Sequence, residues 1–171
     1  MNRRAFRFRL YPNAEQQQAL TLQFGHARFA YNWSLATRKA HYAEHGKGLT
    51  YYDLKRRFTE LKQTAAFAWL READSQVLQA KVEDLDRTYT NFFAKRARYP
   101  RFKSRKRAQS IRYPQRFKFD GNRNRIYLPK VGWVKAVFHR PLAGTPKHVT
   151  VTKTKSGHYF VSIQCEQCEG E

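Results

Sequence analysis

The amino-acid sequence predicts an α+β protein that combines an antiparallel β-sheet or small β-barrel with an inserted helical bundle. Residues 5–11 alternate apolar and cationic side chains, the period-two pattern of a half-buried strand. Between residues 13 and 98 apolar side chains recur every three or four positions, as on helices. From residue 125 onward, β-branched and aromatic runs alternate with turn residues. A single strand cannot bury its face alone, so the predicted domains are residues 1–12 with 99–171 for the sheet and residues 13–98 for the helices.

The first predicted strand has one apolar and one cationic face. Phe6, Phe8 and Leu10 occupy alternate positions, and Arg7 and Arg9 lie between them. Successive side chains of a strand point to opposite faces, so the apolar set is expected in the core and the arginines outside it.

The first helix is expected to begin after Asn13. Asn13 is a suitable N-cap, and Gln16 lies three residues later, as in a capping box. One apolar stripe follows, along either one long helix or two helices joined near Gly25. The helical pattern ends at Gly46-Lys47-Gly48.

Two more helices are predicted before residue 98. A short one follows Thr50, with Asp53 three residues later. The next begins near Asp74 or Ser75 and continues through Phe93. Its final turn is expected to be basic, which is the favourable charge at a helix C-terminus, at Lys95, Arg96 and Arg98.

The remaining strands are expected at residues 125–129, 133–139, 148–154 and 158–165. The residues that separate them favour turns: Asp120-Gly121-Asn122, Pro141, Gly144 and Ser156-Gly157.

The charge of the chain points to a polyanionic partner. Lys and Arg number 34 against 13 Asp and Glu, a formal net charge of +21 in 171 residues. A folded body this basic repels itself unless an anion neutralises it, and nucleic acid is the favoured partner. A membrane-surface protein would concentrate its charge on an amphipathic helix, whereas the densest basic run here contains two prolines. No stretch approaches the about 20 apolar residues of a membrane span, and the N-terminus lacks a signal-peptide core, so a cytoplasmic protein is expected.

The segment 97–119, ARYPRFKSRKRAQSIRYPQRFKF, mixes nine Lys or Arg with five aromatic residues and has no acid. Cations neutralise phosphates and release counterions, while Tyr99 and Tyr113 are candidates for stacking on bases or for packing the loop onto the domain. Some of Phe102, Phe117 and Phe119 are expected to anchor the core. The candidate contacts to the nucleic-acid backbone are Arg7, Arg9, Arg98, Arg101, Lys103, Arg105, Lys106, Arg107, Arg112 and Lys118.

Motifs for catalysis are missing from the sequence. It has no GxxxxGK[ST], GxGxxG, GxSxG or HExxH. Two-metal nuclease chemistry needs several converging carboxylates. Glu83 and Asp84 point about 100° apart on a helix, and together with Asp86 they are interpreted as a solvated face.

No metal site is predicted. Cys165-x-x-Cys168 has the spacing of half a zinc knuckle, but no second pair accompanies it, so two reduced thiols are favoured. His41 and His45 share a helical face and are interpreted as surface residues of a last helical turn.

Several segments, in order over essentially the whole chain, resemble the N-terminal part of the TnpB family. These segments are AFRFRLYPNAEQQQAL, ARFAYNWSLA, GKGLTYYDL, LQAKVEDLDRTYTNFF, YPRFKSRKR, SIRYPQRFKF and IYLPKVGWVK. The family comprises OrfB-type proteins of insertion-sequence transposons, RNA-guided DNA endonucleases related to type V CRISPR effectors. The resemblance implies an oligonucleotide-binding-like β-barrel, the wedge domain, with an inserted helical recognition domain.

The resemblance also implies the partners and the residues that contact them. Together the two domains would bind a guide RNA and the guide–target heteroduplex, and would recognise a short transposon-adjacent motif on target double-stranded DNA. The positions that match the family's motif-binding residues are Tyr51, Gln79, Gln115 and Arg116. Ser75 stands where some relatives carry a lysine, which points to a different motif.

In the family, a RuvC-like nuclease domain that uses Mg²⁺ and a Cys-based zinc module follow, whereas this sequence stops at Glu171. The chain is therefore expected to bind without cutting and to hold no cofactor, and Cys165 and Cys168 do not match the family's zinc cysteines. Whether another polypeptide supplies the nuclease stays open. The alternatives are a stand-alone helix-turn-helix repressor or transposition regulator, an enzyme complete in itself, and a ribosomal-type RNA-binding protein.

Overall fold

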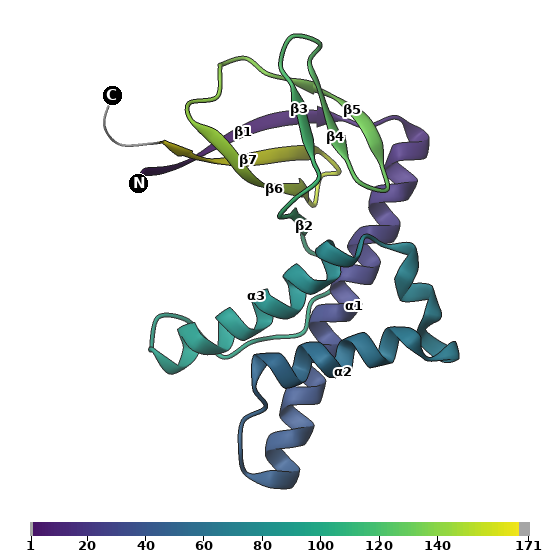
Figure 1. Ribbon diagram of the computed structural model, residues 1–171, viewed down its shortest axis with the longest axis vertical. Coiled ribbons are helices and arrows are strands. Elements are labelled where there is room, and N and C mark those ends of the chain that lie inside the picture. The colour runs from purple at the N-terminus through teal and green to yellow at the C-terminus, as the bar shows by residue number, and fades with distance from the viewer. Residues whose placement is uncertain (1, 168–171) are drawn as a thin grey trace. The chain divides into compact units, whose positions relative to one another are not determined.

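The computed structural model describes residues 2–167 and shows an α+β protein, which confirms the predicted fold class (Figure 1). The helical elements are α1 (Ala14–His45), α2 (Tyr51–Gln63), the 3-10 helix η1 (Ala65–Glu72) and α3 (Ser75–Phe93). The strands are β1 (Asn2–Tyr11), β2 (Gln109–Tyr113), β3 (Lys118–Asp120), β4 (Arg125–Leu128), β5 (Gly132–Val137), β6 (Thr145–Lys153) and β7 (Tyr159–Gln167).

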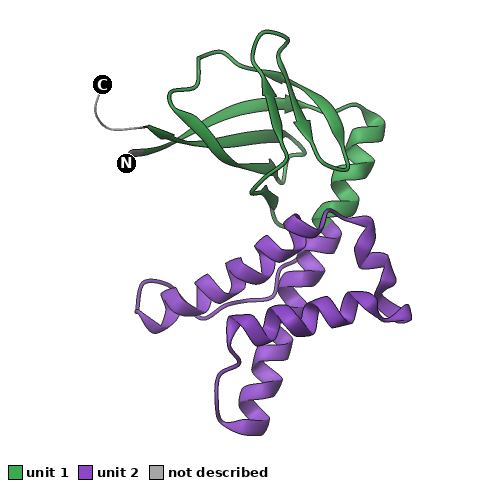
Figure 2. Cartoon of the chain, viewed as in Figure 1, with its two compact units in different colours: residues 1–24, 105–171 green, residues 25–104 purple. Residues whose placement is uncertain are grey.

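The chain divides into two compact units (Figure 2). Unit 1 contains residues 1–24 and 105–171, and unit 2 contains residues 25–104. Helix α1 contributes to both units, because the division falls within it. The sequence predicted domain boundaries after residues 12 and 98. These boundaries stay a prediction.

Unit 1 is built on a seven-stranded antiparallel sheet that curls into a half-barrel (Figure 1). The strand order is β2-β6-β7-β1-β5-β4-β3. Strand β1 pairs with β7 on one side and with β5 on the other. The N-terminal strand thus lies in the middle of a sheet formed by the C-terminal strands. This was predicted, because a single strand cannot bury its apolar face alone.

The core of unit 1 follows the alternation of its strands. The buried side chains of β1 are Phe6, Phe8 and Leu10, while Arg7 is exposed and Arg9 is half-buried. Strands β2, β4, β5, β6 and β7 bury side chains at every second position in the same way: Ile111, Tyr113, Ile126, Leu128, Val134, Ala136, Val149, Val151, Tyr159, Val161, Ile163 and Cys165.

Strands β2 and β3 were not predicted from the sequence, which indicated no strand within the basic segment 97–119. In β2, Ile111 and Tyr113 are buried and Arg112 between them is not. This alternation is short and is surrounded by cations and prolines, so local pattern alone did not distinguish it from a loop.

The predicted caps of the helices are present. The Asn13 amide donates to Gln16 Oε1 at 3.0 Å, and the Gln16 amide donates to Asn13 Oδ1 at 2.8 Å, which is a complete capping box. Thr50 Oγ1 accepts a bond of 3.2 Å from the Asp53 amide at the start of α2. Helix α1 is one continuous helix through Gly25, and it ends where Gly46 adopts a φ of +68°.

The end of α3 differs from the expectation of a basic last turn. The helix stops at Phe93, and the cations follow it. The Lys95 amide donates to Phe92 O at 3.0 Å and the Arg96 amide to Asn91 O at 2.9 Å, the two bonds of a Schellman motif. Lys95 therefore occupies, with a φ of 62°, the left-handed position that usually favours glycine.

The helical elements of unit 2 share one apolar core. Leu35 of α1, Leu54 and Phe58 of α2, and Leu78 and Leu85 of α3 are buried against one another. The 3-10 helix η1, which the sequence analysis missed, adds Leu70 to this core. Its eight residues are too few for a clear apolar period.

Candidate nucleic-acid interface

The outward face of the sheet in unit 1 carries cations and hydroxyls in register. Arg112 of β2 lies opposite Thr150 of β6, Thr150 opposite Ser162 of β7, and Ser162 opposite Arg7 of β1. Opposed residues on paired strands project from the same face of a sheet. The next row along the strands joins Ser110, Thr152, Phe160 and Arg9. We call these eight residues the cationic sheet face.

Aromatic rings hold the arginines of β1 on this face. The Arg7 guanidinium carbon lies 3.9 Å from the centroid of the Phe160 ring. Arg9 lies 5.4 Å from the same ring and 5.3 Å from that of Tyr11. A guanidinium that lies over a ring keeps its N–H donors in its plane, where they are available to phosphate oxygens.

Two carboxylates of unit 1 pair with cations outside the cationic sheet face. None of its eight residues is acidic. Asp120 lies 3.2 Å from Arg125, and Glu166, near the end of β7, lies 3.3 Å from Arg3 and 3.9 Å from Lys147. Its eight residues thus include three arginines, Arg7, Arg9 and Arg112, and no acidic side chain.

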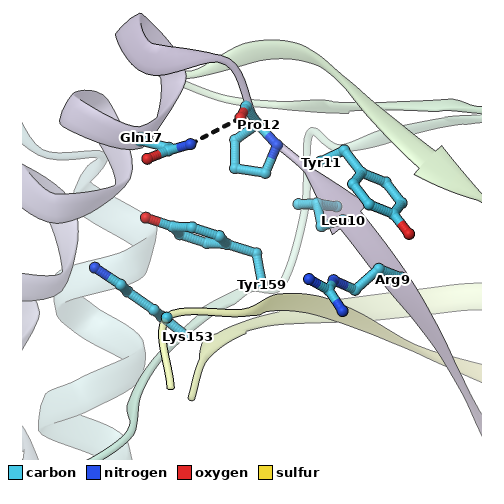
Figure 3. Close-up of a pocket in the computed structure, with 8 residues that line it drawn as sticks. Arg9, Leu10, Tyr11, Pro12, Gln17, Lys153 and Tyr159 are labelled. Carbon is cyan, nitrogen blue, oxygen red and sulfur yellow. Dashed lines mark hydrogen bonds between the residues drawn. The ribbon is translucent and has the colours of Figure 1, made fainter. Parts of the chain in front are cut away.

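A pocket of about 270 Å³ adjoins this face where β1 ends (Figure 3). Its lining includes the side chains of Arg9, Tyr11, Gln17, Lys153 and Tyr159, and none of its lining residues is acidic. The Nε atom of Arg9 is buried and has no hydrogen-bond partner in the described structure. A buried donor of this kind is expected to have a partner, and an anion in the pocket would supply one. We call this site the rim pocket.

The basic segment begins as an exposed loop after α3, from Arg98 onward. The loop is attached to unit 2 at Lys103. The Lys103 amide donates to Asn32 Oδ1 at 2.7 Å, and Asn32 Nδ2 donates to the Lys103 carbonyl at 3.0 Å. The side chains of the predicted backbone-binding cations in this loop are exposed: Arg98, Arg101, Lys103, Arg105, Lys106 and Arg107. Lys118 of β3 is exposed too.

The two tyrosines predicted to stack on bases have different environments. Tyr113 is completely buried, and its hydroxyl donates to Pro129 O at 3.2 Å and accepts from Gln23 Nε2 at 2.9 Å. The prediction that Tyr113 stacks on bases is thus wrong, because neither face of its ring is accessible. Tyr99 is 42% exposed, and its hydroxyl lies 2.9 Å from that of Tyr89. Burial is the main cause that raises the pKa of Tyr89 far above its usual range, and this hydrogen bond is the second.

The residues predicted to bind a DNA motif lie in both units. Tyr51 is the first residue of α2, and its partly buried side chain packs against the core of unit 2. Ser75 and Gln79 lie one turn apart on α3, at positions that share a helical face, and Ser75 is exposed. Gln115 and Arg116 lie in the exposed turn between β2 and β3, where Arg116 has a φ of 64°. The motif-binding role of these five residues stays a prediction.

The carboxylates of α3 are paired with arginines. Arg87 lies 3.2 Å from Glu83 and 3.7 Å from Asp84, and Arg38 lies 3.0 Å from Asp86. The rings of His41 and His45 have centroids 4.6 Å apart, and no third ligand from the described part of the chain joins them. Residues 2–167 contain no group of three His, Cys, Asp or Glu side chains arranged to hold a metal ion. Cys165 is buried, and Cys168 lies outside the described residues.

Several residues of these sites were not predicted from the sequence. Phe160 and Tyr159 lie on β7, which pairs with β1, and Lys153 lies on β6, which pairs with β7. Alternation along β7 was a signal that Phe160 points outward, but its position beside Arg7 depends on the register of two distant strands. Among the described residues, no helix has the length and apolar character that crossing a membrane requires.

Comparison with family models finds a helix-turn-helix domain of the OrfB type, associated with IS605, over residues 1–47. In the structure this region contains strand β1 and the single helix α1, up to and just beyond its end. Two helices joined by a tight turn, which a DNA-reading helix-turn-helix requires, are not formed by the described residues of this region.

Three relatives show how far the similarity extends. The candidate RNA-guided DNA endonuclease InsQ of Escherichia coli (strain K12) is 38% identical over 162 residues, which cover 95% of this chain and 40% of InsQ. A candidate RNA-guided DNA endonuclease of Streptomyces pristinaespiralis is 36% identical over 168 residues, which cover 96% of this chain and 42% of that protein. The virulence protein VsdF of Salmonella dublin is 38% identical over 109 residues, which cover 58% of this chain and 92% of VsdF.

The chain thus spans about two fifths of the length of the two endonuclease relatives and aligns with nearly all of VsdF. The similarity to the first two extends over almost every residue of this chain, including both units of the structure. The chain belongs to the TnpB family, the OrfB-type proteins of insertion sequences.

Proposed function

We propose that this chain is the nucleic-acid-binding portion of an RNA-guided DNA endonuclease and that its cationic sheet face binds the backbone of the guide RNA. The observation that carries this proposal is the row Arg112, Thr150, Ser162 and Arg7, in which two arginines flank two hydroxyls on four neighbouring strands. Neighbouring strands lie about 4.8 Å apart, so the row spans about 14 Å. Phosphates follow one another every ~3.4 Å of axis along each strand of a duplex, so the row reaches several of them.

The chemistry of this face suits a sugar-phosphate backbone. Arg7 and Arg112 provide charged donors, and Thr150 and Ser162 provide hydroxyls that donate to phosphate oxygens or exchange bonds with the ribose 2′-OH. The Phe160 ring lies 3.9 Å from the Arg7 guanidinium carbon and helps to hold this cation in place. Such contacts fix the position of a strand but carry little sequence information, as expected where base pairing supplies the specificity.

The rim pocket would bind a phosphate of the same strand. The Arg9 Nε atom lacks a partner in the described structure, and Lys153 contributes a second cation to the lining. The Lys153 Nζ lies 5.5 Å from the Tyr159 ring, which positions the ammonium over an apolar wall. A phosphate in this pocket would satisfy the buried donor and neutralise both cations.

Recognition of a transposon-adjacent motif on target double-stranded DNA is assigned to Tyr51, Ser75, Gln79, Gln115 and Arg116. Glutamine and arginine side chains form paired hydrogen bonds to base edges in the major groove. Gln115 and Arg116 are both exposed in the turn between β2 and β3, which supports this proposal because a side chain must be accessible to reach a base edge.

Residues 2–167 are proposed to bind without cutting. Cleavage of DNA by two metal ions requires converging carboxylates, and those of α3 pair with Arg38 and Arg87. A nuclease domain would come from the rest of a longer protein or from a separate polypeptide.

The proposal is tested by comparing two variants that remove the same charge. Arg7→Gln with Arg112→Gln changes the cationic sheet face, and Arg123→Gln with Lys130→Gln changes exposed cations in two turns of unit 1. Each lost phosphate contact lowers the slope of log affinity against log salt by about 0.7 for a single RNA strand. We expect a decrease of about 1.4 for the first variant and a smaller one for the second. Equal decreases would mean that only net charge matters, and the cationic sheet face would not be the binding site.

A further inference from the structure

Unit 2 contains a pocket of about 400 Å³ that the proposed function does not use. Its lining residues come from the second half of α1, the loop after α1, the end of α3 and the chain after α3. They include Lys39, Tyr42, Tyr89, Phe92, Phe93 and Tyr99. We call this site the aromatic pocket. Of the candidate residues predicted from the sequence, only Tyr99 lies in its lining.

Two rings of the aromatic pocket are open to solvent. Phe93 is 70% exposed and Tyr42 is 63% exposed. Large aromatic side chains that serve only the core are buried, so exposure on this scale around one pocket indicates a binding surface.

Contacts between Tyr89, Phe92, Phe93 and Tyr99 fix the orientations of these rings. Tyr99 meets Tyr89 edge to face, with centroids 5.5 Å apart, and meets Phe92 in the same way at 5.2 Å. The hydroxyls of Tyr89 and Tyr99 lie 2.9 Å apart. The Phe93 ring lies within 24° of parallel to that of Tyr89 at a centroid distance of 6.2 Å. An aromatic group entering the pocket would therefore meet rings whose orientations are already fixed.

The charges at the aromatic pocket are positive. Arg38 is neutralised by Asp86 at 3.0 Å and lies over the Tyr89 ring at 4.1 Å. Lys39 has a different environment, because its Nζ lies 4.9 Å from the Phe102 centroid and 5.4 Å from that of Tyr99. None of the lining residues is acidic. A cation held over rings without a carboxylate attracts an anion that carries its own flat group.

We propose that the aromatic pocket binds one unpaired nucleobase of the RNA, with its ring against Phe93 or Tyr42 and its phosphate near Lys39. This inference rests on the proposed function, since it specifies one nucleotide of the nucleic acid that the chain binds. A second copy of this chain fits poorly, because its net charge of +21 would repel the lysine. An acidic peptide would satisfy Lys39 but would leave the exposed rings without partners. A pocket of this volume lies at the lower end of the range for small-ligand sites, about 300–1,000 Å³, which suits a single nucleotide.

The test uses two RNA hairpins that differ in one nucleotide. The first has a single bulged 2-aminopurine, and the second is fully paired. We expect the full chain to bind the bulged hairpin about tenfold more tightly, because stacking of one base on aromatic side chains strengthens binding by this order. Quenching of 2-aminopurine fluorescence should accompany binding, since an aromatic neighbour quenches a stacked base.

The double variant Tyr42→Ala with Phe93→Ala should lose both the preference and the quenching while keeping its affinity for the paired hairpin. Tyr52→Ala is the matched control, because Tyr52 is a 79% exposed aromatic on α2 that does not line the pocket. Melting temperatures of all variants establish that they are folded. A preference that persists in the double variant, or equal binding of both hairpins by the unaltered chain, would overturn the aromatic-pocket proposal and leave the proposed function standing. If neither hairpin binds at low salt, both the proposed function and the aromatic-pocket proposal are wrong.

Discussion

Arg7 and Phe160 come from opposite ends of the chain, and the guanidinium carbon of Arg7 lies 3.9 Å from the centroid of the Phe160 ring. Their contact follows from the pairing of β1 with β7, in which Arg7 lies opposite Ser162 and Arg9 opposite Phe160. An apolar ring on an exposed face thus orients a cation that would otherwise sample many rotamers. The sheet supplies to RNA a donor whose orientation is already set.

Replacing the ring tests this preorganisation. We expect Phe160→Leu to weaken RNA binding about two- to fivefold, because an exposed cation–π contact contributes about 0.5–1 kcal/mol. Combined with Arg7→Gln, the loss should be smaller than the sum of the two single losses, because the two side chains act as one unit. Calorimetric titration of the four proteins completes the cycle, and strictly additive losses would show that Phe160 does not act through Arg7.

The left-handed backbone at Lys95 gives a prediction about stability. Lys95→Gly should raise the free energy of unfolding by about 0.5–1 kcal/mol, because glycine adopts this conformation without the strain that a Cβ atom causes. Lys95→Ala is the control, since it removes the same charge and keeps the Cβ. Urea unfolding measures both, and a more stable alanine variant would assign the effect to charge instead.

Cys165 is predicted to be unreactive in the folded chain. Its side chain is buried, and burial raises the pKa of its thiol, so little thiolate is present at neutral pH. In a Cys168→Ser variant, we expect alkylation by iodoacetamide to be at least about 100-fold slower in buffer than in urea, because labelling requires opening of the sheet. Mass spectrometry follows the reaction, and similar rates in both conditions would contradict the burial of this strand.

One comparison distinguishes recognition of a DNA motif from general affinity for DNA. A DNA motif is first selected with the unaltered chain from a randomised duplex library. Gln79→Ala should then cost about 1–3 kcal/mol on duplexes with that motif and little on duplexes without it. Gln18→Ala, at an exposed glutamine of α1, is the matched control. An unchanged ratio of affinities for Gln79→Ala would remove this residue from the proposed set, and Arg116 and Ser75 would be tested next.

Much of the fold was predictable because its signals are local. The capping box of Asn13 and Gln16 and the cap at Thr50 depend on residues three apart, and both form as predicted. The apolar and cationic faces of β1 also follow from its own alternation. Strand β2 escaped prediction because Ile111 and Tyr113 are its only fully buried side chains and lie among cations.

The sites were less predictable because they depend on contacts between distant segments. Tyr113 and Tyr99 both lie between an arginine and a proline in the sequence. Tyr113 is nevertheless buried, because β2 pairs with β6 and because its hydroxyl forms hydrogen bonds with Gln23 and Pro129. The rim pocket joins Arg9 of β1 to Lys153 and Tyr159, and no local pattern relates these positions. Tyr42 and Phe93 line one pocket because the second half of α1 and helix α3 belong to the same unit.

The most direct test of the central claim is to sequence the nucleic acid that co-purifies with the chain, in parallel for the unaltered protein and for Arg7→Gln with Arg112→Gln. We expect the unaltered chain to enrich one RNA encoded at an end of an insertion sequence. The double variant should lose this RNA, while the Arg123→Gln, Lys130→Gln control should retain it. Recovery of operator-like duplex DNA without any enriched RNA, or equal enrichment by the double variant, would show that the cationic sheet face does not bind a guide RNA.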